Sequence, residues 1–271
     1  MVIVMISSFL EKISFEKVDE VQQLQKRVRN LYLLFMFLFF ISFIYSIESN
    51  TIFWMILAVC FTPVVLISYA VFNNFLLKKI DSVLLTHLNV KSYLEILNAI
   101  GPEQEGRKSI LSKSNYYLRI TLVYFLLGRA DDSEKALEKV NNYLERKKKF
   151  LINYHYLRAL IAISQRDKYH FEETYNSLIE ISKKEEVVKS VVSIVKAMFD
   201  IENLNTNDYF DNLDSHNNLE KIIFNFFKAK NQLLLRDTEG AKKTFQQIAN
   251  ENPELFYVRE AKKYLEELAN D

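Results

Sequence analysis

The sequence predicts an all-α protein, in which a two-span transmembrane helical hairpin is followed by a domain built from helical hairpins. Three observations favour this class. Two apolar runs that contain no charged residue occupy residues 31–47 and 52–72. The 271 residues include only 4 Gly and 3 Pro, the residue types that most often interrupt helices. Beyond the second run, apolar residues recur every three or four positions, which is the spacing of one helix face.

We expect four parts along the chain. They are an N-terminal amphipathic helix on the cytoplasmic side (1–30), the transmembrane hairpin (31–72), a membrane-proximal helical pair (73–108) and a helical-repeat domain (109–271). In the first part, apolar residues at helical spacing form one narrow stripe, namely Ile13, Val18, Val21, Leu24 and Val28. This stripe either packs on the C-terminal region, lies on the membrane surface or serves as a self-association seam.

The apolar runs have the length of membrane-spanning helices. They contain 17 and 21 residues, which as helices extend about 26 and 31 Å against a hydrocarbon core of about 30 Å. No ionisable residue lies inside either run, which argues against a proton or ion pathway. Pro63 in the second run is expected to kink its helix. The alternative is a pair of buried core helices in a soluble protein.

The charges that flank the hairpin predict its orientation. Lys and Arg residues precede the first run (26–29) and follow the second (Lys78 and Lys79), whereas the connection 48–51 has none. Basic flanks stay on the cytoplasmic side, so we expect a multi-pass plasma-membrane protein with both termini in the cytoplasm. The abundance of Asn, Lys, Ile, Phe and Tyr is typical of an AT-rich genome, and we therefore expect a bacterial source.

The region after the hairpin is predicted to consist of short helices with short connections. A helix over 91–100 ends at Gly101-Pro102, and the polar stretch 103–108 marks a boundary. Nine further helices are expected near 111–127, 132–148, 150–164, 168–183, 185–202, 206–214, 217–235, 238–250 and 254–269.

A spacing pattern near the C-terminus carries a family resemblance. Ala241, Phe245, Ile248 and Pro253 follow one another at intervals of 4, 3 and 5, and Ala229 lies twelve positions before Ala241. This resembles the second helix of the tetratricopeptide repeat, which has a period of about 34 residues. In that repeat a small residue lets two helices approach closely, and the aromatic residue fills the groove to the next repeat. The resemblance implies an α-solenoid that offers a surface for protein partners.

Weaker copies of the pattern occur earlier in the chain. Ala136 and Thr174 begin similar sets, and the step from Thr174 to Ala241 is close to twice the period of the tetratricopeptide repeat. The predicted repeat-packing residues are therefore Ala136, Ala241, Phe245 and Pro253. Helical hairpins without repeat character are the alternative.

The sequence offers no group that predicts catalysis or cofactor binding. Four histidines are widely separated, and Cys60 is the only cysteine, so we expect no metal site and no cofactor. Phosphate-loop, nucleophile-elbow and kinase motifs are absent, and we expect a protein that is not an enzyme. The acidic ladder Asp208, Asp211 and Asp214 lacks the glycine and glutamate of a calcium loop and is expected to cap a helix. The net charge of +1 argues against nucleic acid as a partner.

Tyrosines on consecutive predicted helices suggest a surface for a partner. We expect Tyr117, Tyr124, Tyr154 and Tyr156 to line a groove for a protein or peptide, with core packing as the alternative. The predicted function is a membrane-anchored cytoplasmic scaffold or adaptor. The alternative function is a peptide-sensing or accessory subunit of a bacterial transport or secretion system. The expected partners are the lipid bilayer and an unidentified protein or peptide, with homo-oligomerisation through the hairpin or the N-terminal helix as a further option.

Overall fold

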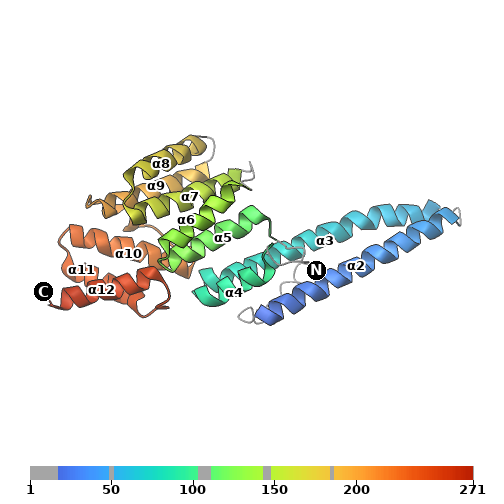
Figure 1. Ribbon diagram of the computed structural model, residues 1–271, viewed down its shortest axis with the longest axis horizontal. Coiled ribbons are helices and arrows are strands. Elements are labelled where there is room, and N and C mark those ends of the chain that lie inside the picture. Colours follow the sequence, from blue (N-terminus) through green and yellow to red (C-terminus); the bar gives the residue numbers. More distant parts are fainter. Residues whose placement is uncertain (1–17, 49–51, 103–110, 143–147, 184–185, 271) are drawn as a thin grey trace. The chain divides into compact units, whose positions relative to one another are not determined.

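The protein is helical throughout the part that the structure describes. The computed structural model describes residues 18–48, 52–102, 111–142, 148–183 and 186–270, and all regular structure in these ranges is helical (Figure 1). The predicted all-α class is therefore confirmed. Contacts divide the chain into two compact units, Met1–Val83 and Leu84–Asp271. This division lies within the membrane-proximal part that we expected over 73–108.

The N-terminal unit is built on two long helices, α2 (Val18–Glu48) and α3 (Ile52–Leu85). They lie side by side and antiparallel (Figure 1), and the rings of Tyr32 and Tyr69 meet with centroids 4.7 Å apart. The helix predicted to end near residue 30 is continuous with the first apolar run. Its expected beginning at residues 1–17, with Ile13, lies outside the described residues, as does the connection 49–51.

The hairpin exposes its apolar side chains. Nineteen large apolar side chains between Leu31 and Ile67 are exposed, against three in the rest of the described chain. Both helices are long and apolar enough to cross a membrane, and only 6% and 11% of their most apolar windows is buried. Helices in the core of a soluble protein would show the opposite distribution. Helix α3 continues through Pro63, where the chain lacks a backbone donor.

The described part of the C-terminal unit contains nine further helices, most of them close to their predicted positions. They are α4 (Val90–Ile100), α5 (Lys113–Leu126), α6 (Ala130–Asn141), α7 (Lys148–Gln165), α8 (Lys168–Ser182), α9 (Glu186–Glu202), α10 (Asn218–Leu234), α11 (Thr238–Ala249) and α12 (Phe256–Asn270). The helix expected over 206–214 is wrong, because this segment contains only the 3₁₀ helix η1 (Asp208–Phe210). Six of its nine residues are Asn, Asp or Thr, which favour local side-chain to backbone bonds over helix.

The turns of the hairpins reveal a repeat that the sequence pattern showed only in part. Five described residues have a left-handed backbone with φ between 57° and 73°, and they recur at nearly regular intervals. They are Leu88, Gly128, Arg166, Leu204 and Arg236. Each follows a helix, and the last carbonyl groups of that helix accept bonds from the turn. Three of the four intervals between these hairpin turns are longer than the period of the tetratricopeptide repeat, and the last is slightly shorter.

A small buried residue accompanies four of these turns. Seven positions before the left-handed residue the chain has, in order, Thr121, Ala159, Ala197 and Ala229. None of these side chains is more than 1% exposed. A small residue at this point allows the two helices of a hairpin to cross closely. In the α5–α6 hairpin, the Ser133 hydroxyl even donates to the Thr121 carbonyl across the crossing, at 2.9 Å.

This register corrects the alignment made from the sequence. The residue directly after each left-handed position occupies the N-cap position of the second helix. In three hairpins these residues are Arg129, Asp167 and Asp237. Counted from them, the equivalents of Ala241 are Ser133 and Phe171, which are almost fully buried. Ala136 and Thr174 align with Thr244 instead, three positions later. Pairing Thr174 with Ala241 therefore joined positions that are not equivalent.

The hairpins pack in a closed circuit. The first helices contact one another in the order α5, α7, α9, α10 and α12, and α12 then contacts α5 again. The second elements α6, α8 and η1 each contact their own first helix and the next one, and α11 likewise contacts α10 and α12. In an open solenoid each repeat contacts only its neighbours. Because α12 also contacts α5, the predicted α-solenoid arrangement is not confirmed.

Candidate functional site

The predicted tyrosine groove is placed largely in packed surroundings. Tyr117 and Tyr154 are 7% and 6% exposed, and Tyr124 and Tyr156 are half-buried. Burial, followed by the nearby Glu220 carboxylate, raises the pKa of Tyr156 to about 12. The structure brings one of the four, Tyr154, to a groove that is described below. Most of the side-chain surface of Tyr117, Tyr154 and Tyr156 is thus packed inside the protein and is not open to a partner.

The helix α12 and the loop before it bond to two earlier turns, the turn between α5 and α6 and the turn that precedes α4. The Arg259 Nη2 atom donates to the Leu127 carbonyl at 2.8 Å. The Asn252 side chain donates to the Leu88 carbonyl at 2.9 Å, although the two residues lie far apart in the chain. Gly128 has a φ of 73°, and a Cβ there would meet the Phe256 ring at 3.0 Å. Glycine therefore allows this close approach of α12 to the turn.

Aromatic rings fill the space beneath α12. The Tyr257 ring lies 5.1 Å from Phe226 and 6.3 Å from Phe125, measured between centroids. The Tyr264 ring stacks on Phe245 at 4.9 Å, with 5° between the ring planes. Burial, followed by the nearby Tyr156, raises the pKa of Tyr257. The contact of Tyr257 with Phe125 joins α12 to α5, whereas the other two join α12 to its chain neighbours α10 and α11.

A groove between α6 and α8 is a candidate for a binding site among the described residues. In the described residues these two second helices do not contact each other, and α7 lies between them as a floor. The groove has a volume of about 240 Å³. Its apolar lining consists of Leu137, Tyr154, Ile161 and Ala162. Its polar lining consists of Glu134, Glu138, Asn141, Arg158, Gln165 and His170.

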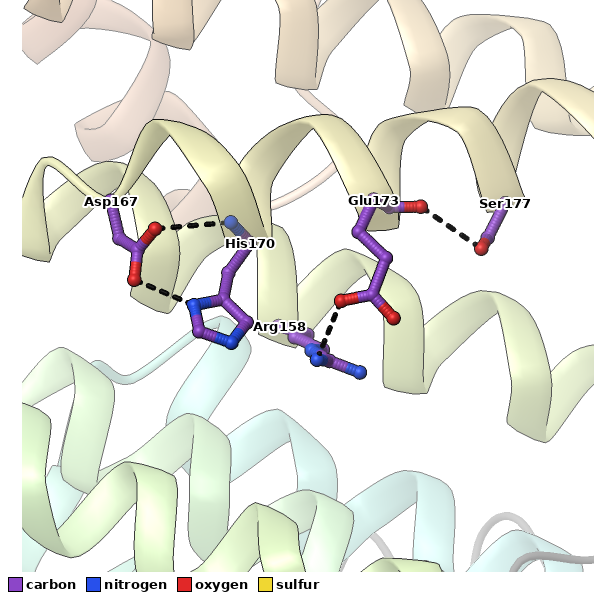
Figure 2. A network of polar contacts seen from close by, with 5 residues as sticks. All are labelled: Arg158, Asp167, His170, Glu173 and Ser177. Atoms are coloured by element: carbon purple, nitrogen blue, oxygen red, sulfur yellow. Dashed lines mark hydrogen bonds and ion pairs between the residues drawn. The ribbon is translucent and has the colours of Figure 1, made fainter.

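Figure 2 shows polar contacts of two residues that line this groove, Arg158 and His170. The Arg158 guanidinium lies 2.9 Å from the Glu173 carboxylate, so its charge is offset within the protein. The Asp167 carboxylate caps α8 by accepting from the His170 backbone N–H at 3.0 Å, and its second oxygen lies 2.6 Å from the His170 ring nitrogen. These bonds from His170 hold the pKa of Asp167 below its usual value.

A half-buried histidine, His155, lies next to these residues. The Nδ1 atom of His155 is buried and has no hydrogen-bond partner among the described residues. Burial, and then the nearby Arg158 charge, lowers the pKa of His155, whereas the Glu173 carboxylate opposes this shift. His155 does not itself line the groove, whose polar lining consists of hydrogen-bonding and charged groups. Such a set of groups suits recognition of a ligand.

The remaining predicted residues take the following places. Ala241 and Phe245 are fully buried and Ala136 is 5% exposed, whereas Pro253 lies exposed in the loop before α12. Among the described residues, no group of three His, Cys, Asp or Glu side chains is placed to hold a metal ion. In the acidic ladder, Asp208 begins η1, and Asp211 follows it with its backbone N–H bonded to the Asp208 carbonyl.

The described residues form an all-helical protein. One unit is a hairpin of two long helices with exposed apolar side chains, and the other is a closed array of shorter helices. No protein-family model matches the chain, and no curated protein and no solved structure matches it either. The tetratricopeptide resemblance therefore stays a prediction that depends on Ala241, Phe245 and Pro253.

Proposed function

We propose that the protein is a membrane-anchored scaffold or adaptor, which holds its C-terminal unit on the cytoplasmic side of a plasma membrane. The observation that supports this most directly is the contrast in exposure between the two units. Nineteen exposed large apolar side chains lie between Leu31 and Ile67, and the described residues of the C-terminal unit expose three, Tyr169, Leu204 and Leu235. Exposed apolar patches of this extent mark contact with a membrane or with protein.

A bilayer suits the hairpin better than a protein partner does. The exposed apolar residues lie on all sides of α2 between Leu31 and Ile47, whereas a protein contact needs only one stripe. A helix of 31 residues is about 46 Å long, which exceeds a hydrocarbon core of about 30 Å. The basic residues at 26–29 and at Lys78 and Lys79 favour a cytoplasmic position for both ends of the hairpin.

The C-terminal unit supplies the second half of the proposal. Small residues at the crossings and the recurrent turns support a repeat-like scaffold, which is rigid enough to present a surface. Within this unit, the groove between α6 and α8 offers a mostly polar surface, because the apolar residues that line it are at most 6% exposed. The partner is proposed to bind there.

Cysteine labelling tests the membrane half. Cys60 is the one cysteine of the chain and lies exposed on α3 within the apolar run. In intact membranes we expect it to resist a water-soluble maleimide and to react after solubilisation in a denaturing detergent. In a Cys60→Ser background, the variant Glu251→Cys should react only after the cytoplasmic face is opened. Labelling of Cys60 in intact membranes contradicts the embedding, and labelling at position 251 in intact cells contradicts the orientation.

Photo-crosslinking tests the binding half. A photoreactive amino acid is placed at position 138 of the full-length chain in its native membrane, with position 95 on α4 as the matched exposed control. We expect a discrete cross-linked protein adduct from position 138 and none of that size from position 95. Equal adducts from both positions, or none from position 138, contradict a binding role for the groove.

A further inference from the structure

The charges at one end of the hairpin indicate which lipids it binds. We propose that the basic residues at the beginning of α2 and in the last third of α3 bind the headgroups of anionic phospholipids. They are Lys26, Arg27, Arg29, Lys78 and Lys79. This inference rests on the proposed membrane anchoring and adds the chemical class of the lipid. Three features support it, namely the position of the cations, the direction of one of them and the lack of acidic residues among them.

The five cations lie at one end of the hairpin, next to its apolar runs. The two helices are antiparallel (Figure 1), so the beginning of α2 and the later part of α3 lie at the same end. The paired rings of Tyr32 and Tyr69 lie just inside the cations, as is typical of tyrosines at a membrane interface. At about 1.5 Å per residue, Arg29 and Lys26 lie about 3 and 8 Å before the first run begins at Leu31. A headgroup layer about 5–8 Å thick therefore surrounds them.

The Lys78 side chain is directed towards the bilayer. Lys78 follows the end of the second run, at Phe72, by about 9 Å along the helix. Its Nζ atom lies 5.9 Å from the centroid of the Phe75 ring, which is nearly one turn closer to that run. Long basic side chains near the end of a membrane-spanning helix extend in this way towards the headgroups. The Lys78 ammonium group is therefore nearer to the lipid than its backbone is.

Acidic residues are absent from the same zone. Residues 21–30 of α2 and 73–80 of α3 contain the five cations and no Asp or Glu. The nearest acidic residues, Glu20 and Asp81, lie on the side away from the apolar runs. Among the described residues, none of the five cations forms an ion pair with a carboxylate. Three of them are exposed, namely Lys26, Arg27 and Lys78. Their charges are therefore available to an anion.

The other end of the hairpin has the opposite character. Residues 46–54 contain one acidic residue, Glu48, and no Lys or Arg. Anionic headgroups are therefore attracted to one leaflet only. Groups of about 4–8 basic residues directly beside a membrane-spanning helix attract anionic lipids, and the five cations of this hairpin fall within that range. An arginine can also donate two parallel hydrogen bonds to one phosphate, so Arg27 and Arg29 are expected to form the stronger contacts.

Spin-labelled lipids test the proposal on the full-length protein in phosphatidylcholine vesicles. Phosphatidylglycerol and phosphatidylcholine carry the same label on an acyl chain, and electron paramagnetic resonance measures the fraction of each lipid that the protein immobilises. We expect phosphatidylglycerol to associate about threefold more strongly than phosphatidylcholine, and this preference to fall as salt rises. Equal association of the two lipids overturns the inference.

Variants locate the preference on the hairpin. A triple variant neutralises the cations of α2, as Lys26→Gln, Arg27→Gln and Arg29→Gln. It should lose most of the preference for phosphatidylglycerol. A control variant neutralises three exposed cations of the C-terminal unit, as Lys135→Gln, Lys221→Gln and Lys243→Gln. It should keep the preference, and flotation with the vesicles shows that each variant is inserted. An unchanged preference in the triple variant, or an equal loss in the control, overturns the assignment to these residues.

Two further results separate lipid from a free anion and the inference from the anchoring proposal. Inorganic phosphate at constant ionic strength should leave the preference for phosphatidylglycerol unchanged, and competition by phosphate contradicts the assignment to lipid. If the protein immobilises both lipids to the same extent, the inference fails and the membrane anchoring stands. If it immobilises neither lipid, both are rejected.

Discussion

The two units of this protein use the same secondary structure with opposite surfaces. In the hairpin, Phe37 is 59% exposed and Phe40 is 61% exposed, while in the C-terminal unit Phe171 and Phe245 are at most 1% exposed. The helices of both units are rich in apolar residues, so apolar content alone does not separate them. The difference lies in its arrangement, which is unbroken around α2 and restricted to stripes in the shorter helices. The distribution of apolar residues around a helix thus indicates whether the helix faces lipid or packs against other helices with one side in water.

The two units also differ in how helices meet. In the hairpin, α2 and α3 meet through rings such as Tyr32 with Tyr69 and Phe39 with Phe61. In the C-terminal unit the crossings are formed by small residues such as Ala159 and Ala229, and rings fill the spaces between hairpins. Close crossings need small residues because the backbones approach one another. The following predictions test this contrast, beginning with the largest expected effect.

The largest effect is expected from removing the same ring in each unit. Phe245→Ala should lower the free energy of unfolding of the C-terminal unit by about 4 kcal/mol, because it leaves a cavity beside Tyr264 and Phe226. Phe37→Ala removes an exposed ring and should leave this free energy unchanged. Urea titration of the full chain in micelles, followed by circular dichroism, measures both. A similar loss in the two variants contradicts the contrast between the units.

A smaller effect is expected from enlarging a crossing residue. Ala229→Leu should destabilise the C-terminal unit by about 2 kcal/mol, because the added atoms have to fit where α10 and α11 cross. Ala269→Leu makes the same change on the exposed side of α12, and we expect a change below about 0.5 kcal/mol. Thermal unfolding of both variants provides the comparison. If Ala229→Leu is neutral, the small residues do not define the crossings.

Closure of the circuit can be tested at its hydrogen bonds. Arg259→Gln removes the donor to the Leu127 carbonyl and should cost about 1.5 kcal/mol. Amide hydrogen exchange should then accelerate in α12 and at the turn around Gly128. Lys262→Gln removes an exposed charge from the same helix and should have neither effect. If exchange accelerates throughout the C-terminal unit and not only in α12 and the turn around Gly128, the contact of α12 with this turn does not open independently of the rest of the unit.

The smallest effect is expected from pH. The pKa of His155 is lowered in the folded state by burial, so the unfolded chain binds a proton at a higher pH than the folded chain does. Its contribution to stability is therefore complete above the unfolded value of about 6.5 and is lost as pH falls below it. His155→Phe should weaken the decline of the unfolding free energy between about pH 7 and pH 5. Urea titrations of both proteins at several pH values measure this decline.

Local patterns were sufficient to predict most of the helices. The spacing of apolar residues placed α7, α8, α10 and α11 within a few residues of their observed bounds. The same approach failed at 206–214, where Phe210 is buried against Phe224 and Phe227 without belonging to a regular α-helix. There the polar contacts of Asn207 with Asn231 and Asp200 hold the segment. Asn231 lies outside any local sequence window.

The candidate site was harder to predict than the fold. Its α6 wall is visible in the sequence as Glu134 and Glu138 on one helix face. The groove itself exists because α6 and α8 remain apart above α7, and no sequence spacing states that distance. The aromatic pattern favoured tyrosines, of which Tyr117 and Tyr154 proved to be buried. Burial depends on neighbours from other helices, which a single sequence does not show.

The sequence by itself determined the helical class, the apolar hairpin and the positions of most helices, because these depend on propensity and on spacing along one helix. Only the tertiary structure decided the register of the repeat, the closure of α12 onto α5 and the groove over α7. These features depend on contacts such as that of Asn252 with Leu88, which are far apart in the chain. Such contacts form when several helices pack together, and their energy is shared among residues that no local pattern connects.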